Sequence, residues 1–93
     1  PGQPGAINKT SLFHAPNIIL NWEASPGLVD NYTVTVTEVN ETKSVMNTTL
    51  GSNSTRIEVN GLQHGRDYTV VIVANRFDKT SDQRTDYFCT VII

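Results

Sequence analysis

The sequence predicts an all-β protein: a seven-stranded antiparallel sandwich that forms one domain over residues 1–93. Three observations carry this prediction. Apolar side chains recur at a period of two, threonine is the commonest residue, and turn-forming residues recur about every 8–12 positions. No stretch combines the helical i, i+3, i+4, i+7 spacing of apolar residues with flanking helix caps. The pattern therefore favours short strands over helices.

The first half of the chain contains four predicted strands, at 5–11, 17–23, 30–38 and 44–50. The residues before them, Pro1-Gly2-Gln3-Pro4-Gly5, have the composition of an interdomain linker. They equally suit the start of a strand, where proline is tolerated, and both interpretations stay open. In the second strand Ile18, Leu20 and Trp22 occupy alternate positions, so they share one face.

The second half contains three predicted strands, at 55–60, 66–75 and 84–92. In the sixth, Tyr68, Val70 and Ile72 alternate with Thr69, Val71 and Val73. Glycine, proline, serine and asparagine gather between the strands, as expected for turns. These turn signals are Ser25-Pro26-Gly27, Gly51-Ser52-Asn53, Asn60-Gly61 and His64-Gly65.

Four large residues are predicted to form the structural core, because their spacing places them on inward faces. They are Trp22, Tyr32, Leu62 and Tyr68. The tryptophan and the tyrosines each carry one polar group that needs a partner when the ring is buried.

These residues also carry a resemblance to the fibronectin type III domain. Trp22 lies on the second strand, Tyr32 opens the third strand, and the run from Gly61 to Val70 reads GLQHGRDYTV. That run resembles the family's leucine-to-tyrosine corner, in which the hydroxyl of the tyrosine at the start of the sixth strand bonds to upstream backbone. The resemblance spans the chain and implies an immunoglobulin-like sandwich that serves as a non-catalytic module.

A narrower resemblance concerns the parent protein. Trp22 followed by Pro26-Gly27-Leu28-Val29-Asp30-Asn31-Tyr32, and Leu62 followed by Gly65-Arg66 and Tyr68, are similar to repeats of receptor-type tyrosine phosphatase ectodomains. Many adhesion and matrix proteins contain similar strings.

Five Asn-x-Ser/Thr tripeptides indicate an extracellular glycoprotein. With the chain's content of asparagine, serine and threonine, chance would supply about two. Each such tripeptide is an acceptor for N-linked glycan in a secreted or lumenal protein. The candidate glycosylation sites are Asn8, Asn31, Asn40, Asn47 and Asn53.

Composition excludes several partners. A net charge of −2 provides no basic field for nucleic acid. The longest apolar run, Val70 to Ala74, is far shorter than a bilayer span, so no membrane insertion by this segment is expected.

The chain starts with Pro1, which predicts a segment of a longer protein whose neighbouring domains are its first partners.

Cys89 is the single cysteine, so an internal disulfide and a cysteine-rich zinc site are both excluded. Its parity with Tyr87 and Val91 predicts an inward side chain that packs as a small hydrophobe. Pairing with another domain or chain is the alternative.

No catalytic or metal site can be assembled, and no cofactor is expected. His14 and His64 fall in a loop and a turn without a third ligand at useful spacing. No Ser, His and Asp set suggests a triad, and no glycine-rich loop precedes a helix. The domain is therefore predicted not to be an enzyme.

The segment 75–84 is the candidate partner-binding loop, because loops on a rigid sandwich are where recognition usually occurs. Its candidate binding residues are Arg76, Phe77 and Lys79. Phe77 is expected to be either a binding anchor or a residue folded back on the core edge. The outward Val71 and Val73 form a second candidate face, which strand propensity explains equally well.

The leading functional hypothesis is an extracellular structural, adhesive or spacer module of a cell-surface receptor. The narrower resemblance implies a receptor tyrosine phosphatase as the parent protein. One alternative is a ligand-binding receptor domain that contacts an extracellular protein through 75–84. Another is an accessory domain of a secreted enzyme.

Overall fold

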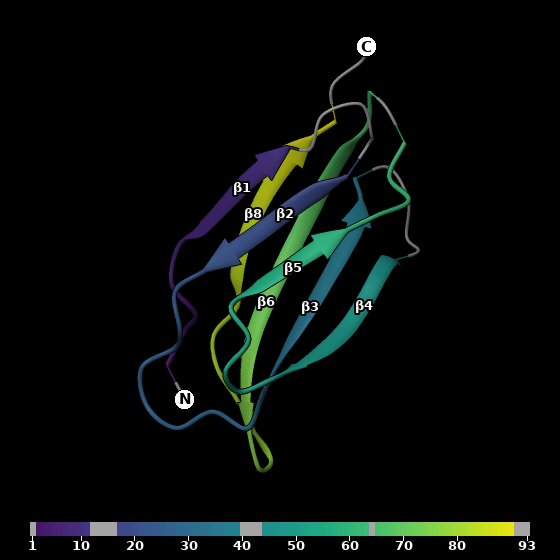
Figure 1. The fold of residues 1–93 in the computed structure, drawn as a ribbon. Coiled ribbons are helices and arrows are strands. Elements are labelled where there is room, and N and C mark those ends of the chain that lie inside the picture. The colour runs from purple at the N-terminus through teal and green to yellow at the C-terminus, as the bar shows by residue number, and fades with distance from the viewer. Residues whose placement is uncertain (1, 12–16, 40–43, 64, 91–93) are drawn as a thin grey trace.

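The structure, a computed structural model, describes residues 2–11, 17–39, 44–63 and 65–90 as a two-layer β-sandwich (Figure 1). All seven predicted strands are present, and one two-residue strand is added. The described residues contain no helix, and hence none that is long and apolar enough to cross a membrane. The strands are β1 (Ile7–Ser11), β2 (Ile18–Trp22), β3 (Asn31–Glu38), β4 (Ser44–Gly51), β5 (Arg56–Val59), β6 (Asp67–Arg76), β7 (Lys79–Thr80) and β8 (Arg84–Cys89).

The two layers are a three-stranded sheet, β1-β2-β5, and a five-stranded sheet. In the larger sheet β4, β3 and β6 are consecutive neighbours, and both β7 and β8 pair with β6. All pairings are antiparallel. The molecule is elongated, with a longest extent of 42 Å, and the described chain starts and finishes near opposite ends (Figure 1). The predicted all-β antiparallel sandwich is thus confirmed.

The core lies between the sheets and follows the alternation in the sequence. Along β6 the side chains of Tyr68, Val70, Ile72 and Ala74 are buried, while the residues between them are half-buried. The same alternation appears in β2 and β3, because successive strand residues face opposite sides of a sheet. Trp22, Tyr32, Leu62 and Tyr68 all lie in this core, with at most 4% of any of them exposed.

Trp22 and Tyr32 contact each other within the core. Their rings pack edge to face, with centroids 5.8 Å apart and planes at 68°, an arrangement that aromatic quadrupoles favour. The Tyr32 hydroxyl accepts a hydrogen bond from the Ser25 backbone N–H at 3.0 Å. This bond ties the segment between β2 and β3 to the core.

Residues 2–5 lie before β1 and are held against the sandwich. The N–H groups of Gly2 and Gly5 donate to the carbonyls of Pro26 and Glu23, both at 2.9 Å. Pro4 is fully buried. A Cβ at Gly5 would lie only 2.4 Å from Glu23 Cβ, so this close approach needs a glycine.

Lys9 on β1 links the two sheets, because it contacts two residues of β8. Its Nζ donates to the Tyr87 carbonyl at 2.9 Å and forms an ion pair with Asp86 Oδ2 at 2.9 Å. Partial burial would by itself raise the pKa of Asp86, but the Lys9 hydrogen bond, the Tyr87 N–H and the lysine charge together hold that pKa below its ordinary value of 3.8.

This pair predicts a small loss of stability in acid. A carboxylate with a depressed pKa stabilises the fold above its unfolded-state pKa, and that contribution disappears as the pH falls through the folded-state pKa. At pH 7 the wild-type chain should exceed Lys9→Met by up to about 1 kcal/mol in free energy of unfolding, as for other partly exposed pairs. The part of this difference that depends on the Asp86 charge should disappear below the folded-state pKa of Asp86, whereas the Lys9 hydrogen bond to the Tyr87 carbonyl does not depend on that charge. Urea unfolding of both chains across pH 2–7 measures it (about five points suffice).

The control for that measurement is Lys79→Met, since Lys79 has no ion pair among the described residues. Its stability difference from wild type should not change with pH in the acid range. A Lys9→Met difference that persisted unchanged at the lowest pH would contradict the assignment of the pair.

The predicted inward position of Cys89 is wrong, because its side chain is exposed. Tyr87, which has the same parity, is 66% exposed. The inward row of β8 instead contains Phe88, which packs against the core and stacks on Tyr68 with ring centroids 5.3 Å apart. Tyr87, Phe88 and Cys89 are consecutive apolar residues, so periodicity alone could not choose between the two faces. The predicted strand residues 91–92 lie outside the described residues.

Candidate recognition surface

The segment 75–84 is mostly a β-hairpin and not a loop. Asn75 and Arg76 end β6 and pair with Thr80 and Lys79 of β7, so the turn consists of Phe77 and Asp78 alone. Figure 1 shows this hairpin extending beyond the sandwich, at the end where the described chain begins. Since the hairpin has no buried face there, it shows no hydrophobic alternation, and periodicity could not reveal it.

Phe77 occupies the tip of this hairpin in an unusual backbone conformation. Its φ is +54°, and it is the one non-glycine residue with positive φ in the described chain. A bulky residue in this region is a conformational outlier, and two-residue hairpin turns normally place glycine or asparagine where φ is positive. Its side chain is 82% exposed. Of the two predicted placements for Phe77, the one folded against the core is therefore wrong.

The Phe77 conformation is held by Asp30, the residue before β3. The Phe77 N–H donates to Asp30 Oδ2 at 2.9 Å, and Arg76 Nη1 lies 3.6 Å from Asp30 Oδ1. The Arg76 guanidinium lies over the Phe77 ring, 4.7 Å from its centroid, within the range of a cation–π contact. One carboxylate thus anchors both residues, and the hairpin tip presents a cation stacked on an exposed aromatic ring.

Asp30 was not among the residues predicted from sequence. It is far from Phe77 along the chain, and no local motif marks it. The β3–β6 register brings it there, because Asn31 lies opposite Asn75 and the Asp30 N–H donates to the Asn75 carbonyl at 2.8 Å.

A polar network on the outward sheet face supports the base of the hairpin. Asn75 Nδ2 donates to Asn31 Oδ1 at 2.8 Å and to Thr33 Oγ1 at 2.9 Å. The Thr80 hydroxyl donates to Asn75 Oδ1 at 3.1 Å. The side chains of Asn31 and Thr33 in the Asn31-Tyr32-Thr33 tripeptide therefore both accept hydrogen bonds within the fold. Lys79 is exposed and lies beside Arg76 in the strand register.

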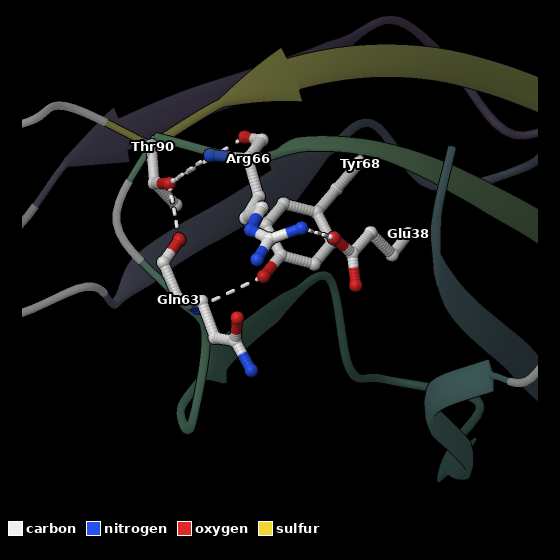
Figure 2. Close-up of polar contacts among 5 residues, drawn as sticks. All are labelled: Glu38, Gln63, Arg66, Tyr68 and Thr90. Carbon is white, nitrogen blue, oxygen red and sulfur yellow. Dashed lines mark hydrogen bonds and ion pairs between the residues drawn. The ribbon is translucent and has the colours of Figure 1, made fainter. Parts of the chain in front are cut away.

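The opposite end of the sandwich carries the tyrosine corner (Figure 2). The Tyr68 hydroxyl accepts a hydrogen bond from the Gln63 N–H at 2.9 Å. Arg66 Nη1 contacts Glu38 Oε1 at 3.1 Å, which joins the corner to the end of β3. The Thr90 hydroxyl accepts from the Arg66 N–H at 3.0 Å and donates to the Gln63 carbonyl. These hydrogen bonds stabilise the corner.

The candidate glycosylation sites differ in exposure. Asn8 on β1, Asn47 on β4 and Asn53 in the turn after β4 are exposed. Asn31 on β3 is half-buried, and its carbonyl oxygen is bonded to Asn75. Asn40 lies outside the described residues. Three asparagines are therefore accessible to modification on different parts of the surface.

The described ranges contain no group of three or more His, Cys, Asp or Glu side chains that is placed to hold a metal ion. His14 and His64 lie outside these ranges. The second candidate face, around Val71 and Val73, is half-buried and carries the Thr33 hydroxyl that bonds to Asn75.

Two antiparallel sheets of three and five strands, an inward tryptophan on β2 and a tyrosine corner before β6 define a β-sandwich of the immunoglobulin-like class. The family model of the fibronectin type III domain matches residues 13–87, and the chain belongs to this family. Such domains are generally non-catalytic modules. Among curated proteins, none matches the chain in sequence.

Solved structures agree on the fold. A computationally redesigned β-sandwich protein superimposes with a TM-score of 0.88 at 20% identity, covering 97% of this chain and 90% of that one. A two-domain fibronectin type III segment of chicken tenascin gives 0.88 at 21% identity, covering 97% of this chain and 50% of the segment. Chicken CNTN1 domains FN1–FN3 give 0.84 at 14% identity, covering 99% of this chain and 31% of that one. The chain thus spans half or less of the two multidomain relatives.

Proposed function

We propose that this chain is an extracellular structural module, a rigid and glycosylated spacer or adhesive unit of a cell-surface receptor. The exposure of Asn8, Asn47 and Asn53 carries the proposal, because glycan transfer and retention need an accessible asparagine. The elongated shape, in which the described chain starts and finishes near opposite ends, suits a unit in a linear array. A receptor-type tyrosine phosphatase is one parent of this kind.

A secretory host tests the proposal directly. The chain expressed with a signal peptide should leave the cell heavier than its 10.3 kDa and return to that mass after enzymatic deglycosylation. The Asn8→Gln, Asn47→Gln and Asn53→Gln variants should each remove one glycan. Asn31→Gln should change the mass least, because Asn31 is half-buried and hydrogen-bonded. Secretion at the unmodified mass would contradict the proposal.

A second candidate function is recognition of an extracellular protein through the β6–β7 hairpin. The observation that favours it is the strained, exposed Phe77 beneath the Arg76 guanidinium. Backbone strain concentrates at functional sites, and arginine and aromatic residues are enriched among binding hot spots. Lys79 adds a second cation on the neighbouring strand. The third hypothesis, an accessory domain of a secreted enzyme, has no specific support in the described residues.

Phe77→Gly separates recognition from folding. Glycine adopts positive φ without the cost of roughly 1–3 kcal/mol that a strained non-glycine residue pays. The variant should therefore fold at least as stably as wild type by thermal melting, while binding of a cell-surface ligand, measured by panning on ectodomain-expressing cells, falls at least tenfold. The matched control is Val39→Gly, which removes an exposed apolar side chain after the far end of β3. Unchanged binding by Phe77→Gly would contradict a role for this hairpin in recognition.

A further inference from the structure

Strand β4 forms an open edge of the larger sheet. Within the described part of the chain it pairs with β3 alone, through a register that runs from Asn31 opposite Gly51 to Thr37 opposite Ser44. The register shifts once, at Val36/Thr37, so the stretch from Met46 to Gly51 is regular. An edge strand of this kind presents unpaired N–H and C=O groups that can add another strand.

The other edges of the sandwich carry the protective features that β4 lacks. On β1, Lys9 reaches across to β8, and charged residues discourage strand addition. β5 has four residues, of which Arg56 and Glu58 are exposed and charged. β7 has only two residues, and β8 contains Arg84 and Asp86. β4 has eight residues without a charge or a proline.

The β4 sequence is also complementary to itself. If two copies pair antiparallel about a two-fold axis at Thr48, then Met46 faces Leu50 and Asn47 faces Thr49. Met46 and Leu50 are half-buried and pack against the core, so pairing would cover their exposed parts. Asn47 and Thr49 are exposed polar residues on the opposite face. Every pair therefore joins like with like, and no charges oppose each other.

The ends of the pairing also fit. Val45, which is 40% exposed, would lie opposite Gly51 of the second copy. A Cβ at Gly51 would have no atom within 4 Å, so there is open space beside this residue for a facing side chain.

We propose that the β4 edge is a strand-addition site for β4 of a second copy of this chain, and that N-glycan on Asn47 closes it. Asn47 stands one residue from the two-fold axis, so two glycans would meet at the centre of the pairing. The glycan would prevent strand addition at β4, as charged residues do at the other edges of the sheets. The second half of this proposal rests on the proposed glycosylated, extracellular function.

The first experiment uses unglycosylated chain from bacteria. Light scattering over a concentration series should show a monomer–dimer equilibrium, and hydrogen exchange should show β4 amides gaining protection in the dimer. In Asn47→Lys/Thr49→Lys, lysines would lie directly opposite each other in the pairing, and like charges in that position are destabilising. We expect the dimer dissociation constant to rise about tenfold or more.

The chain offers a matched control, because β1 contains the same tripeptide pattern. Asn8→Lys/Thr10→Lys changes two exposed edge-strand residues of the same types at the same spacing, and its dimerisation should equal that of wild type. Thermal melts establish that both double variants are folded. An unglycosylated chain that stayed monomeric, a dimer without protection of β4, or equal dimerisation of the two variants would overturn the proposal.

The second experiment uses glycosylated chain from a secretory host. Wild type should be monomeric, Asn47→Gln should dimerise, and Asn8→Gln should remain monomeric. If secreted wild type carries glycan on Asn47 and still dimerises through β4, the capping role is wrong. If the secreted chain carries no glycan anywhere while the bacterial chain dimerises through β4, the proposed extracellular function fails and the edge site stands.

Discussion

Replacing Trp22 with alanine should lower the free energy of unfolding by about 3–5 kcal/mol, the usual cost of deleting a large buried aromatic side chain. Trp22 is 4% exposed, lies in the hydrophobic core cluster and packs edge to face on Tyr32. The lost area and the remaining cavity both contribute. Because domains of this size have total stabilities of about 5–15 kcal/mol, the variant should be close to unfolding.

Chemical denaturation followed by circular dichroism measures this effect. Trp22→Phe is the matched variant, because it keeps an aromatic ring. It removes part of the ring volume and the Nε1–H group, which has no hydrogen-bond partner among the described residues. It should cost much less than the alanine change. An alanine variant with an unchanged denaturation midpoint would show that Trp22 is not part of the core.

Tyr68→Ala should have a similar cost, about 3–5 kcal/mol, and its two parts can be separated. The ring is 1% exposed and stacks on Phe88, while the hydroxyl satisfies the Gln63 N–H. Tyr68→Phe keeps the ring and removes only this acceptor. It should cost about 1–2 kcal/mol, the usual penalty for leaving a partly buried donor without its partner.

Urea unfolding of the wild type and both variants, with a common m-value, gives the two differences. If Tyr68→Phe were as damaging as Tyr68→Ala, the hydroxyl and not the packing would dominate the corner. If Tyr68→Phe had no effect, the corner hydrogen bond would contribute nothing to stability.

Much of the fold was predictable because buried strands impose a period of two on the sequence. Tyr32, Val34 and Val36 alternate with threonines and mark the inward face of β3, and they are fully buried in the structure. Where a strand is only partly buried, the hydrophobic period does not show which side chains face the core. The apolar run at 87–89 suits either face of β8, so the side occupied by Cys89 could not be derived from parity.

The recognition surface was only partly predictable. Composition singled out Phe77 as the large apolar residue of a polar segment, and the structure places it at the tip with a positive φ. Neither the hairpin nor the Asp30 anchor could be read from the chain, because both depend on the register between β3 and β6. Likewise, the open edge of β4 is a property of sheet order, which the strand pattern alone does not determine.

Site-resolved glycopeptide mass spectrometry of the secreted chain tests the central claim most directly, because it asks whether the exposed acceptors are used. We expect high occupancy at Asn8, Asn47 and Asn53, which are exposed, and the lowest occupancy at Asn31, whose carbonyl oxygen is bonded to Asn75. Unmodified asparagine at all of these positions, in chain recovered from the medium, would contradict the claim that this domain is a glycosylated extracellular module.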